Sequence, residues 1–211
     1  MIDIYAFATP NSIKVPIALE EAGLVYDLHS VNVRAGEQKL PEFLALNPNA
    51  KVPVLVDSDG PDGTQLVLTE SAAILVYIAE KTGKLLPQTG VERARVFEQL
   101  FFHASALSPS FGQAGYFQKF APEPLPHAID RFLDEANRLV DLLEATLGER
   151  SYIVGDELTI ADIVHYGWLW RRAFVGIDFE GRPNLARWFD ALAARPAFQR
   201  AEQRLNALVP A

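Results

Sequence analysis

The first part of the chain switches repeatedly between strand-like and helix-like hydrophobic patterns. Alternating or short apolar runs bounded by turn residues predict four strands, at residues 2–7, 26–33, 52–56 and 66–68. Apolar positions at helical spacing predict helices at residues 13–22, 41–46 and 69–83. A turn rich in Asp and Gly joins the last two strands, which we therefore expect to form a hairpin. The order β-α-β-α-β-β-α predicts a small mixed sheet flanked by helices.

After residues 87–90 (PQTG), which have the composition of a linker, strand patterns nearly vanish. Apolar residues three and four apart predict helices at residues 91–108 and 125–147, from Thr159 onward, and at 183–194 and 197–208. The helix at Thr159 begins with a capping-box pattern in which Asp162 replaces the usual Glu. The predicted fold class is α/β plus all-α, with an α/β domain over residues 1–84 and an all-helical domain over residues 91–208.

Composition and charge argue against nucleic acid and membranes as binding partners. The 211 residues are 49% hydrophobic and 22% charged, as in ordinary globular proteins, and the formal net charge is -8. An acidic surface repels nucleic acid and anionic lipid, so we expect neither as a partner. No apolar run approaches the ~18 residues that span a bilayer. The segment from Met1 to Tyr5 has no basic region and no cleavage signal, so we expect a cytoplasmic protein.

The chain contains no cysteine, which excludes disulfides, thiolate metal sites and a cysteine nucleophile. Its four histidines form no HExxH or HxH motif, and we predict no metal site. Any chemistry must come from hydroxyls, carboxylates, amides, backbone dipoles or a bound small molecule.

Four stretches, in order along nearly the whole chain, resemble the cytosolic glutathione transferases. Residues 47–57 (NPNAKVPVLVD) are similar to that family's NPxGKVPxLxD stretch, and residues 70–80 (ESAAILVYIAE) to its ESxAIxxYLAE stretch. Residues 159–163 (TIADI) resemble the capping motif of its helical domain. Residues 9–15 (TPNSIKV) resemble the TPNGxKV turn of the bacterial Nu class, whose members resemble disulfide-bond reductases as well as transferases. Ser12 and Ala50 stand where the family patterns have glycine.

This resemblance implies a thioredoxin-like, glutathione-binding N-terminal domain, a C-terminal helical bundle and a homodimer. It implies glutathione as the co-substrate, so that the reactive sulfur arrives with the ligand. It also implies that Asp162 has a structural role in capping a helix.

Val52 and Pro53 are candidate contacts for the middle of glutathione. Proline is unusual inside a strand because it has no N–H to donate, and a cis Val52–Pro53 bond would explain its presence. The N–H and C=O of Val52 would then pair with the cysteinyl backbone of glutathione. The alternative is an edge strand that merely tolerates proline.

Glu70 and Ser71 are expected at a helix N-terminus, where free N–H groups and the helix dipole favour an anion. The γ-glutamyl carboxylate of glutathione would bind Ser71, and Glu70 would lie beside the ligand's α-ammonium group. The alternative is ordinary capping of the helix by Ser71.

Thr9 and Asn11 follow the first predicted strand, at the sheet edge where ligands of open α/β sheets bind. Donors aimed at the sulfur of glutathione would favour thiolate over thiol, so we assign these two residues the catalytic role. The alternative is that Asn11 caps a helix and Thr9 is a turn residue. Tyr5 and Ser12 are other candidate hydroxyl donors, although the place of Tyr5 within the strand favours a packing role.

Three further residues are candidates for binding glutathione. By resemblance, Gln38 contacts the glycyl end and Arg131 reaches glutathione across the dimer, and Lys51 would pair with the glycyl carboxylate. The alternatives are a solvated glutamine, a solvated lysine, and a surface ion pair of Arg131 with Asp134 or Glu135.

The sequence therefore predicts a glutathione-dependent enzyme that reduces disulfides through a stabilised glutathione thiolate. One alternative is conjugation of glutathione to an electrophile held near residues 112–120. There Tyr116, Phe117 and Phe120 line an apolar pocket or pack in the core, and we favour the core. A non-catalytic binding or regulatory protein is the third alternative, and the polar groups retained in the site speak against it.

Overall fold

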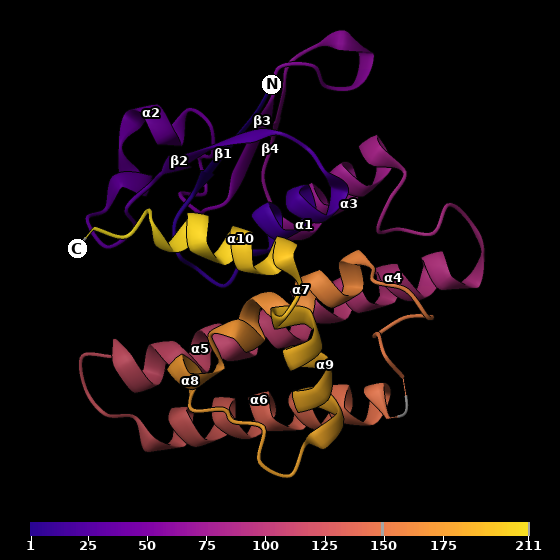
Figure 1. Cartoon of the computed structure of the whole chain (residues 1–211). Helices are drawn as coiled ribbons and strands as arrows, with labels where there is room; N and C mark the ends of the chain where they lie inside the picture. The colour runs from indigo at the N-terminus through magenta and orange to yellow at the C-terminus, as the bar shows by residue number, and fades with distance from the viewer. Residues whose placement is uncertain (149, 211) are drawn as a thin grey trace. The chain divides into compact units, whose positions relative to one another are not determined.

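The computed structural model describes residues 1–148 and 150–210. These residues form two compact units, each described by itself below. The first unit contains Met1–Leu86 and the C-terminal segment from Ala194, and the second contains Pro87–Ala193. Figure 1 shows the strands in the first unit and a set of helices in the second.

The first unit is built on the predicted mixed sheet. Its strands are β1 (Ile2–Ala6), β2 (Tyr26–Ser30), β3 (Val54–Asp57) and β4 (Leu66–Leu68), in the spatial order β2-β1-β3-β4. β1 and β2 are parallel, whereas the pairs β1–β3 and β3–β4 are antiparallel. The prediction of four strands and of the β3–β4 hairpin is confirmed, although β2 ends three residues earlier than expected and β3 begins two residues later.

The strand directions bring several chain segments to one edge of the sheet. Tyr5 lies opposite Val54 in the β1–β3 pair, and Leu55 lies opposite Leu68 in the β3–β4 pair. The carboxyl ends of β1, β2 and β4 therefore meet the amino end of β3 at a single edge. The segments that follow or precede these ends carry most of the predicted site residues.

The helices of the first unit cover the sheet and one another. They are α1 (Lys14–Ala22), α2 (Pro41–Leu44), α3 (Ser71–Thr82) and α10 (Pro196–Asn206), with short 3-10 turns η1 (Glu37–Lys39) and η2 (Pro61–Gly63). α1 packs against both α3 and α10 (Figure 1). Seven of its nine residues are buried as a result, and only the acidic residues Glu20 and Glu21 near its end reach the surface.

The position of α10 differs from the predicted grouping of elements. Residues 197–208 were expected in the all-helical domain, yet α10 packs within the first unit. The reason is an apolar face of Ala197, Phe198, Ala201 and Leu205, which is buried there. Arg195 and Arg200 add ion pairs with Glu21 and Glu20 of α1. The division into an α/β domain at residues 1–84 and a helical domain at residues 91–208 stays a prediction. Its boundaries differ from those of the two compact units.

The second unit is entirely helical in its described part, as predicted. Its elements are α4 (Gly90–Phe102), the π-helical turn η3 (His103–Leu107), α5 (Ser108–Lys119), α6 (Pro126–Leu147), α7 (Ile160–Trp170), α8 (Arg172–Val175) and α9 (Pro183–Ala193). The expected helix at 91–108 thus continues through a π turn into α5, which the sequence analysis missed. Pro109 lies in the first turn of α5, where the absent N–H of proline costs little.

The predicted capping box at the start of α7 is confirmed. The Thr159 hydroxyl accepts a hydrogen bond from Ala161 N–H, and Asp162 accepts one from Thr159 N–H at 3.0 Å. Asp162 also accepts from Ile153 N–H and from the Trp188 indole, each at 2.9 Å. This fully buried carboxylate therefore ties α7 to α9 and to the loop before α7, which supports its structural assignment.

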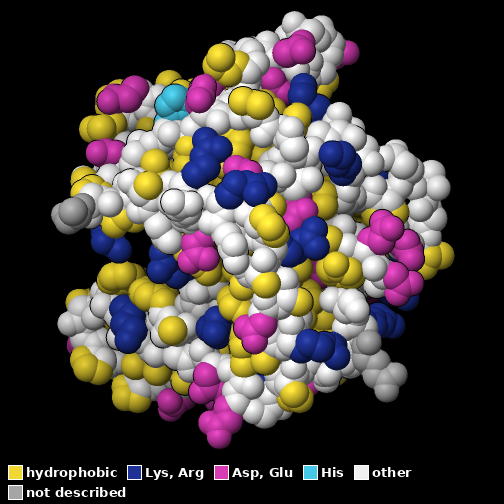
Figure 2. Space-filling view, viewed as in Figure 1, with side chains coloured by type: hydrophobic (Ala, Val, Ile, Leu, Met, Phe, Trp, Pro, Cys, Tyr) yellow, Lys and Arg dark blue, Asp and Glu magenta, His cyan; other side chains and the backbone are white. Residues whose placement is uncertain are grey.

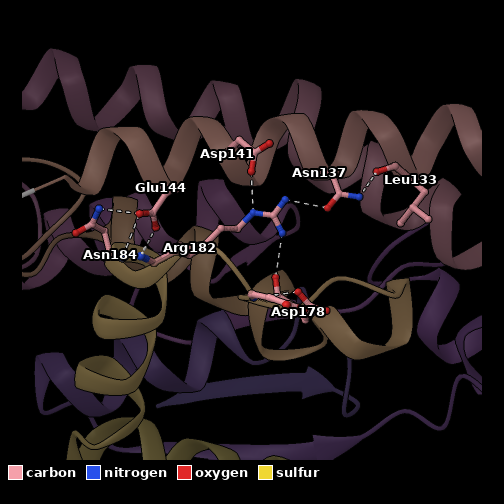
Figure 3. A network of polar contacts seen from close by, with 9 residues as sticks. Leu133, Asn137, Asp141, Glu144, Asp178, Arg182 and Asn184 are labelled. Atoms are coloured by element: carbon pink, nitrogen blue, oxygen red, sulfur yellow. Dashed lines mark hydrogen bonds and ion pairs between the residues drawn. The ribbon is translucent and has the colours of Figure 1, made fainter.

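A second polar network joins α6 to α9 and the loop before it (Figure 3). Arg182 donates to Asp141 at 2.7 Å and to Asn137 at 2.9 Å on α6. The Glu144 carboxylate accepts from Asn184 N–H and from Leu185 N–H, the latter at 2.7 Å. Because these amides belong to the first turn of α9, Glu144 caps that helix from a neighbouring one.

No helix in the described part of the chain is long and apolar enough to cross a membrane. On the face shown in Figure 2, acidic and basic side chains are interspersed rather than gathered into one large basic surface.

Candidate functional site

Thr9 and Ser12 form a compact hydrogen-bonded turn after β1. The hydroxyl oxygens of Thr9 and Ser12 are 2.9 Å apart, and Ser12 N–H donates to Thr9 Oγ1 at 3.2 Å. Ser12 is fully buried, while Thr9 is half-buried. The hydroxyl of Ser12, absent from a glycine, therefore holds the predicted catalytic residue Thr9.

Asn11 and Ser71, from two separate segments, meet at the side chain of Lys14. The Lys14 Nζ donates to Asn11 Oδ1 at 2.7 Å and to Ser71 Oγ at 3.3 Å. The β1–α1 turn and the start of α3 are thus joined by one ammonium group. This places two of the predicted site residues together.

Lys14 is the residue of this cluster to which the sequence analysis gave no role. Its side chain is fully buried. Burial lowers the pKa of Lys14 to about 7, while the carboxylate of Glu70 acts in the opposite direction. A signal was present in the sequence, because Lys14 lies between Ile13 and Val15 in a segment without another charged residue until Glu20.

The start of α3 has an unusual backbone. Glu70, the residue before the helix, has φ 66° and ψ 110°, a conformation that L residues rarely adopt. Strained backbone of this kind persists where surrounding structure enforces it, and it is common at binding sites. Glu70, not Ser71, occupies the N-cap position of α3, and no side-chain capping hydrogen bond is made there. This arrangement does not support the alternative of ordinary N-capping by Ser71.

The segment before β3 presents an unpaired stretch of backbone. The Val52–Pro53 peptide bond is cis, as predicted, and Pro53 is buried. Among the described residues, no hydrogen bond uses the N–H or C=O of Val52. Asn47 fixes the preceding turn, since its side-chain amide donates to the Lys51 carbonyl at 2.7 Å. Val52 therefore lies at the shared sheet edge with its backbone available to a ligand.

Gln38, in η1, has a buried side-chain oxygen without a partner in the described structure. A buried acceptor left unpaired costs about 1–3 kcal/mol, so such atoms call for a partner. The amide N–H groups of a peptide would satisfy this oxygen. The observation favours a ligand-binding role for Gln38 over a solvated loop glutamine.

Lys51 and Tyr5 differ in their surroundings. The Lys51 side chain is exposed. Tyr5 stacks on His29 with ring centroids 4.8 Å apart and packs against the buried cluster that contains Val31 and Phe43. This packing agrees with the role favoured for Tyr5 from its place in the strand.

Arg131 belongs to α6 of the second unit, where it lines a cavity of about 670 Å³. Ser105, Ser110 and His127 line the same cavity. Arg131 forms no ion pair within the described chain, because Glu135 binds Arg138 instead, at 2.7 Å. The charge of Arg131 nevertheless helps to lower the pKa of Glu135, after the larger effect of its hydrogen bond with Arg138.

Comparison with known proteins supplies the family. Residues 8–81 match the model of the glutathione S-transferase N-terminal domain, and residues 107–196 match that of the C-terminal domain. The disulfide-bond oxidoreductase YfcG of Escherichia coli strain K12 is 40% identical over 200 residues, covering 93% of this chain and 92% of that protein.

The chain belongs to the glutathione S-transferase family. Solved structures of this family are also similar to it. A glutathione transferase family member from Pseudomonas fluorescens, with two glutathione molecules bound, is 38% identical with a TM-score of 0.90, covering 95% of this chain and 92% of that one. A glutathione transferase from Pseudomonas putida, with one glutathione disulfide bound per subunit, is 36% identical with a TM-score of 0.89, covering 96% and 90%.

In this glutathione S-transferase, the aromatic residues of α5 do not all pack as expected. Phe117 is half-buried and stacks on Phe132, with ring centroids 5.5 Å apart. Tyr116 and Phe120 are 45% and 67% exposed, so the prediction that they belong to the core is wrong. Tyr116 and Phe120, four residues apart at the end of α5, leave apolar surface exposed on the second unit.

Proposed function

We propose that this glutathione S-transferase binds glutathione at the shared sheet edge and uses its thiolate to reduce disulfides. The observation that carries the proposal is the convergence of Asn11, Val52 and Ser71 at that edge. The unpaired oxygen of Gln38 is a second support. No side chain of this chain is a thiol, so the sulfur must come from the ligand.

The chain offers a contact for each part of the tripeptide. Ser71 and the amides at the start of α3 suit the γ-glutamyl carboxylate, and Glu70 suits its α-ammonium group. The backbone of Val52, held in place by Pro53, suits the cysteinyl unit. Gln38 and the exposed ammonium group of Lys51 suit the glycyl end.

The proposal includes a homodimer, in which Arg131 of the partner subunit contacts glutathione. The lack of an ion pair for Arg131 within the described chain is consistent with this role. The dimer itself rests on the resemblance to the Nu class.

The reaction proceeds by thiol–disulfide exchange. A free thiol has a pKa of about 8.5, and donors from Thr9 and Asn11 favour its thiolate. The thiolate attacks one sulfur of a disulfide, which breaks the S–S bond, forms a mixed disulfide and releases the other half as a thiolate. A second glutathione thiolate attacks the mixed disulfide, giving glutathione disulfide and the second released thiolate. Both released thiolates take up the protons that the two glutathione thiols lost.

The relatives favour disulfide reduction over conjugation. A protein 40% identical is a disulfide-bond oxidoreductase, and a related structure holds glutathione disulfide. Conjugation remains the second candidate because the exposed Tyr116 and Phe120 offer apolar surface for an electrophile.

The test compares turnover of a model disulfide with turnover of a model aryl halide, each with glutathione. We expect faster turnover of the disulfide, and the reverse result would favour conjugation.

Ser71→Ala should weaken glutathione binding by about 1–3 kcal/mol, whereas the exposed Ser151→Ala should leave it unchanged.

Thr9→Ala combined with Asn11→Ala should lower kcat more than affinity, because these donors act on the developing thiolate. Absence of any glutathione binding at millimolar concentration would contradict the proposal.

A further inference from the structure

Lys14 is a buried cation that the proposed chemistry has not yet used. It is the one buried Lys or Arg among the described residues. Its neighbours along α1 are apolar, so an apolar side chain at this position would avoid the cost of removing a charge from water. A charge kept in such surroundings needs partners, and two of its partners here are residues of the proposed glutathione site.

The contact with Asn11 fixes the orientation of an amide. When protonated, the Lys14 amine can only donate hydrogen bonds, and the Asn11 atom that faces it at 2.7 Å is the oxygen. The Nδ2 group of Asn11 then points away from Lys14. Among the described residues, no hydrogen bond uses this Nδ2 group, so both of its N–H donors are available to a ligand.

The contact with Ser71 has the same effect on a hydroxyl. Ser71 Oγ accepts from Lys14 Nζ at 3.3 Å, so its own O–H is left to donate elsewhere. The direction of each hydrogen bond thus follows from the chemistry of the ammonium group. Lys14 converts Asn11 and Ser71 into donors whose acceptor must come from outside the cluster.

We propose that Lys14 is a positioning residue that couples the two ends of the glutathione site. Its ammonium group orients Asn11 toward the sulfur of glutathione and Ser71 toward the γ-glutamyl carboxylate. Both groups it orients face anionic atoms, so its positive charge also favours the bound thiolate and carboxylate. This inference rests on the proposed function and adds to it a residue that serves both ends of the ligand.

The charged groups around Lys14 support this role. Glu70, at the start of α3, is the acid whose field acts on Lys14. The arginines of α10 are matched by acids near the other end of α1, in the pairs Arg195–Glu21 and Arg200–Glu20. Glu70, the residue proposed to hold the ligand's ammonium group, is therefore the charged neighbour that acts on Lys14.

The experiment replaces Lys14 by Met, which keeps an unbranched side chain but has neither charge nor N–H donors. Calorimetry gives the affinity for glutathione, and the ultraviolet absorbance of the thiolate across a pH titration gives the pKa of the bound thiol. We expect about tenfold weaker binding, and a bound thiol pKa higher by about one unit. Unchanged affinity together with an unchanged thiol pKa would overturn the proposal.

Lys84→Met is the matched control. The Lys84 ammonium donates to the Ala22 carbonyl at 2.8 Å, at the opposite end of α1. This substitution removes one lysine charge from the same unit and leaves Asn11 and Ser71 untouched. We expect the affinity and the thiol pKa of this variant to match the wild-type values.

Double-mutant cycles test whether Lys14 acts through Asn11 and Ser71. Lys14→Met is introduced into Asn11→Ala and, separately, into Ser71→Ala. Residues that act through one another give non-additive effects, so Lys14→Met should cost less affinity in each background than in the wild type. Full additivity in both backgrounds would overturn the proposal.

Two further measurements separate the possible failures. Circular dichroism checks folding, and Lys14→Gln serves as a second uncharged variant whose amide can still donate hydrogen bonds, so its losses should be no larger than those of Lys14→Met. Failure of both variants to fold would make Lys14 a requirement for folding and would overturn the positioning role. If wild-type protein binds no glutathione, the proposed function itself fails, whereas binding by the wild type and equal binding by Lys14→Met overturns only the role of Lys14.

Discussion

At the scale of single residues, the candidate site consists of polar groups that hold one another in place. Ser12 holds the hydroxyl of Thr9, and Lys14 holds the amide of Asn11 and the hydroxyl of Ser71. The two Lys14 contacts orient donors of Asn11 and Ser71 before a ligand arrives, whereas the Thr9 hydroxyl donates to Ser12 Oγ and must turn to reach a ligand. Preorganised donors stabilise a developing anion without further rearrangement, which suits thiolate chemistry.

Ala50 is a residue-scale departure from the family pattern with a measurable cost. Its φ of 55° lies in the left-handed region, which costs an L residue about 1–2 kcal/mol. Glycine avoids this cost but loses more entropy on folding, by about 0.5–1 kcal/mol. We therefore expect Ala50→Gly to raise the free energy of unfolding by about 0.5–1 kcal/mol in urea denaturation.

The control for Ala50→Gly is Ala145→Gly. Ala145 is exposed and lies within α6, where glycine lowers stability by about 1 kcal/mol. The two substitutions should thus shift stability in opposite directions. Equal destabilisation by both would show that the left-handed conformation of Ala50 carries no cost.

Sequence reasoning predicted individual site residues where their chemistry and position were both unusual. Thr9 and Asn11 follow a strand, and Pro53 interrupts one, so each was recognisable. Lys14 was missed because a lysine within a helix is ordinarily solvated, and only packing in the folded unit buries it. The lack of a partner for Gln38 likewise depends on three-dimensional packing, which no local pattern encodes.

At the scale of secondary structure, elements with a strong hydrophobic periodicity or a clear capping motif were predicted well. α6 and the capping box of α7 have clear signals and were found. α5 was missed because Ser108, Pro109 and two glycines resemble a loop in composition. The tight approach of Phe174 to Gly115 explains one of those glycines, since a Cβ there would meet the Phe174 ring at less than van der Waals distance.

Asp162 gives an element-scale prediction. Its two carboxylate oxygens accept hydrogen bonds from Ile153, Thr159 and Trp188. Asp162→Asn keeps the shape but turns an amide N–H₂ toward these donors, so buried donors lose their acceptor. We expect a loss of about 3 kcal/mol in the free energy of unfolding, measured by urea denaturation.

The exposed Asp190→Asn on α9 is the control for this change of charge. Its effect should stay within about 0.5 kcal/mol, as for most surface substitutions. A loss at Asp162 no larger than at Asp190 would mean that the capping network contributes little to stability.

At the scale of the whole molecule, the mixed sheet followed from the element order, whereas the packing partner of α10 did not. A β-α-β-α-β-β-α order with short connections leaves few sheet topologies, and the observed mixed sheet is one of them. α10 carries an apolar face that fits any helical partner, so the sequence does not reveal that this partner is α1. Arg195 and Arg200 add ion pairs with two acids of α1 that are distant in the chain, and no local pattern reveals this match.

The dependence of global stability on pH provides the last prediction, because it reports the burial of Lys14. Its pKa is about 7 in the folded protein, against an ordinary value of 10.5. Between these values the unfolded chain binds a proton that the folded protein has lost, so this residue makes stability rise with pH. Below about pH 7 both states carry the proton, and the contribution of Lys14 is constant.

Comparison with Lys14→Met isolates this contribution, since all other titrating groups are shared. Among them, the pKa of Tyr26 is raised by burial, which makes its own contribution fall at high pH in both proteins. Between about pH 7 and pH 10.5, the free energy of unfolding of the wild type should increase relative to that of Lys14→Met by up to about 1.4 kcal/mol per pH unit. Urea denaturation at a series of pH values measures the difference. Parallel profiles for the two proteins would show that Lys14 keeps its ordinary pKa, and would contradict the burial of its ammonium group.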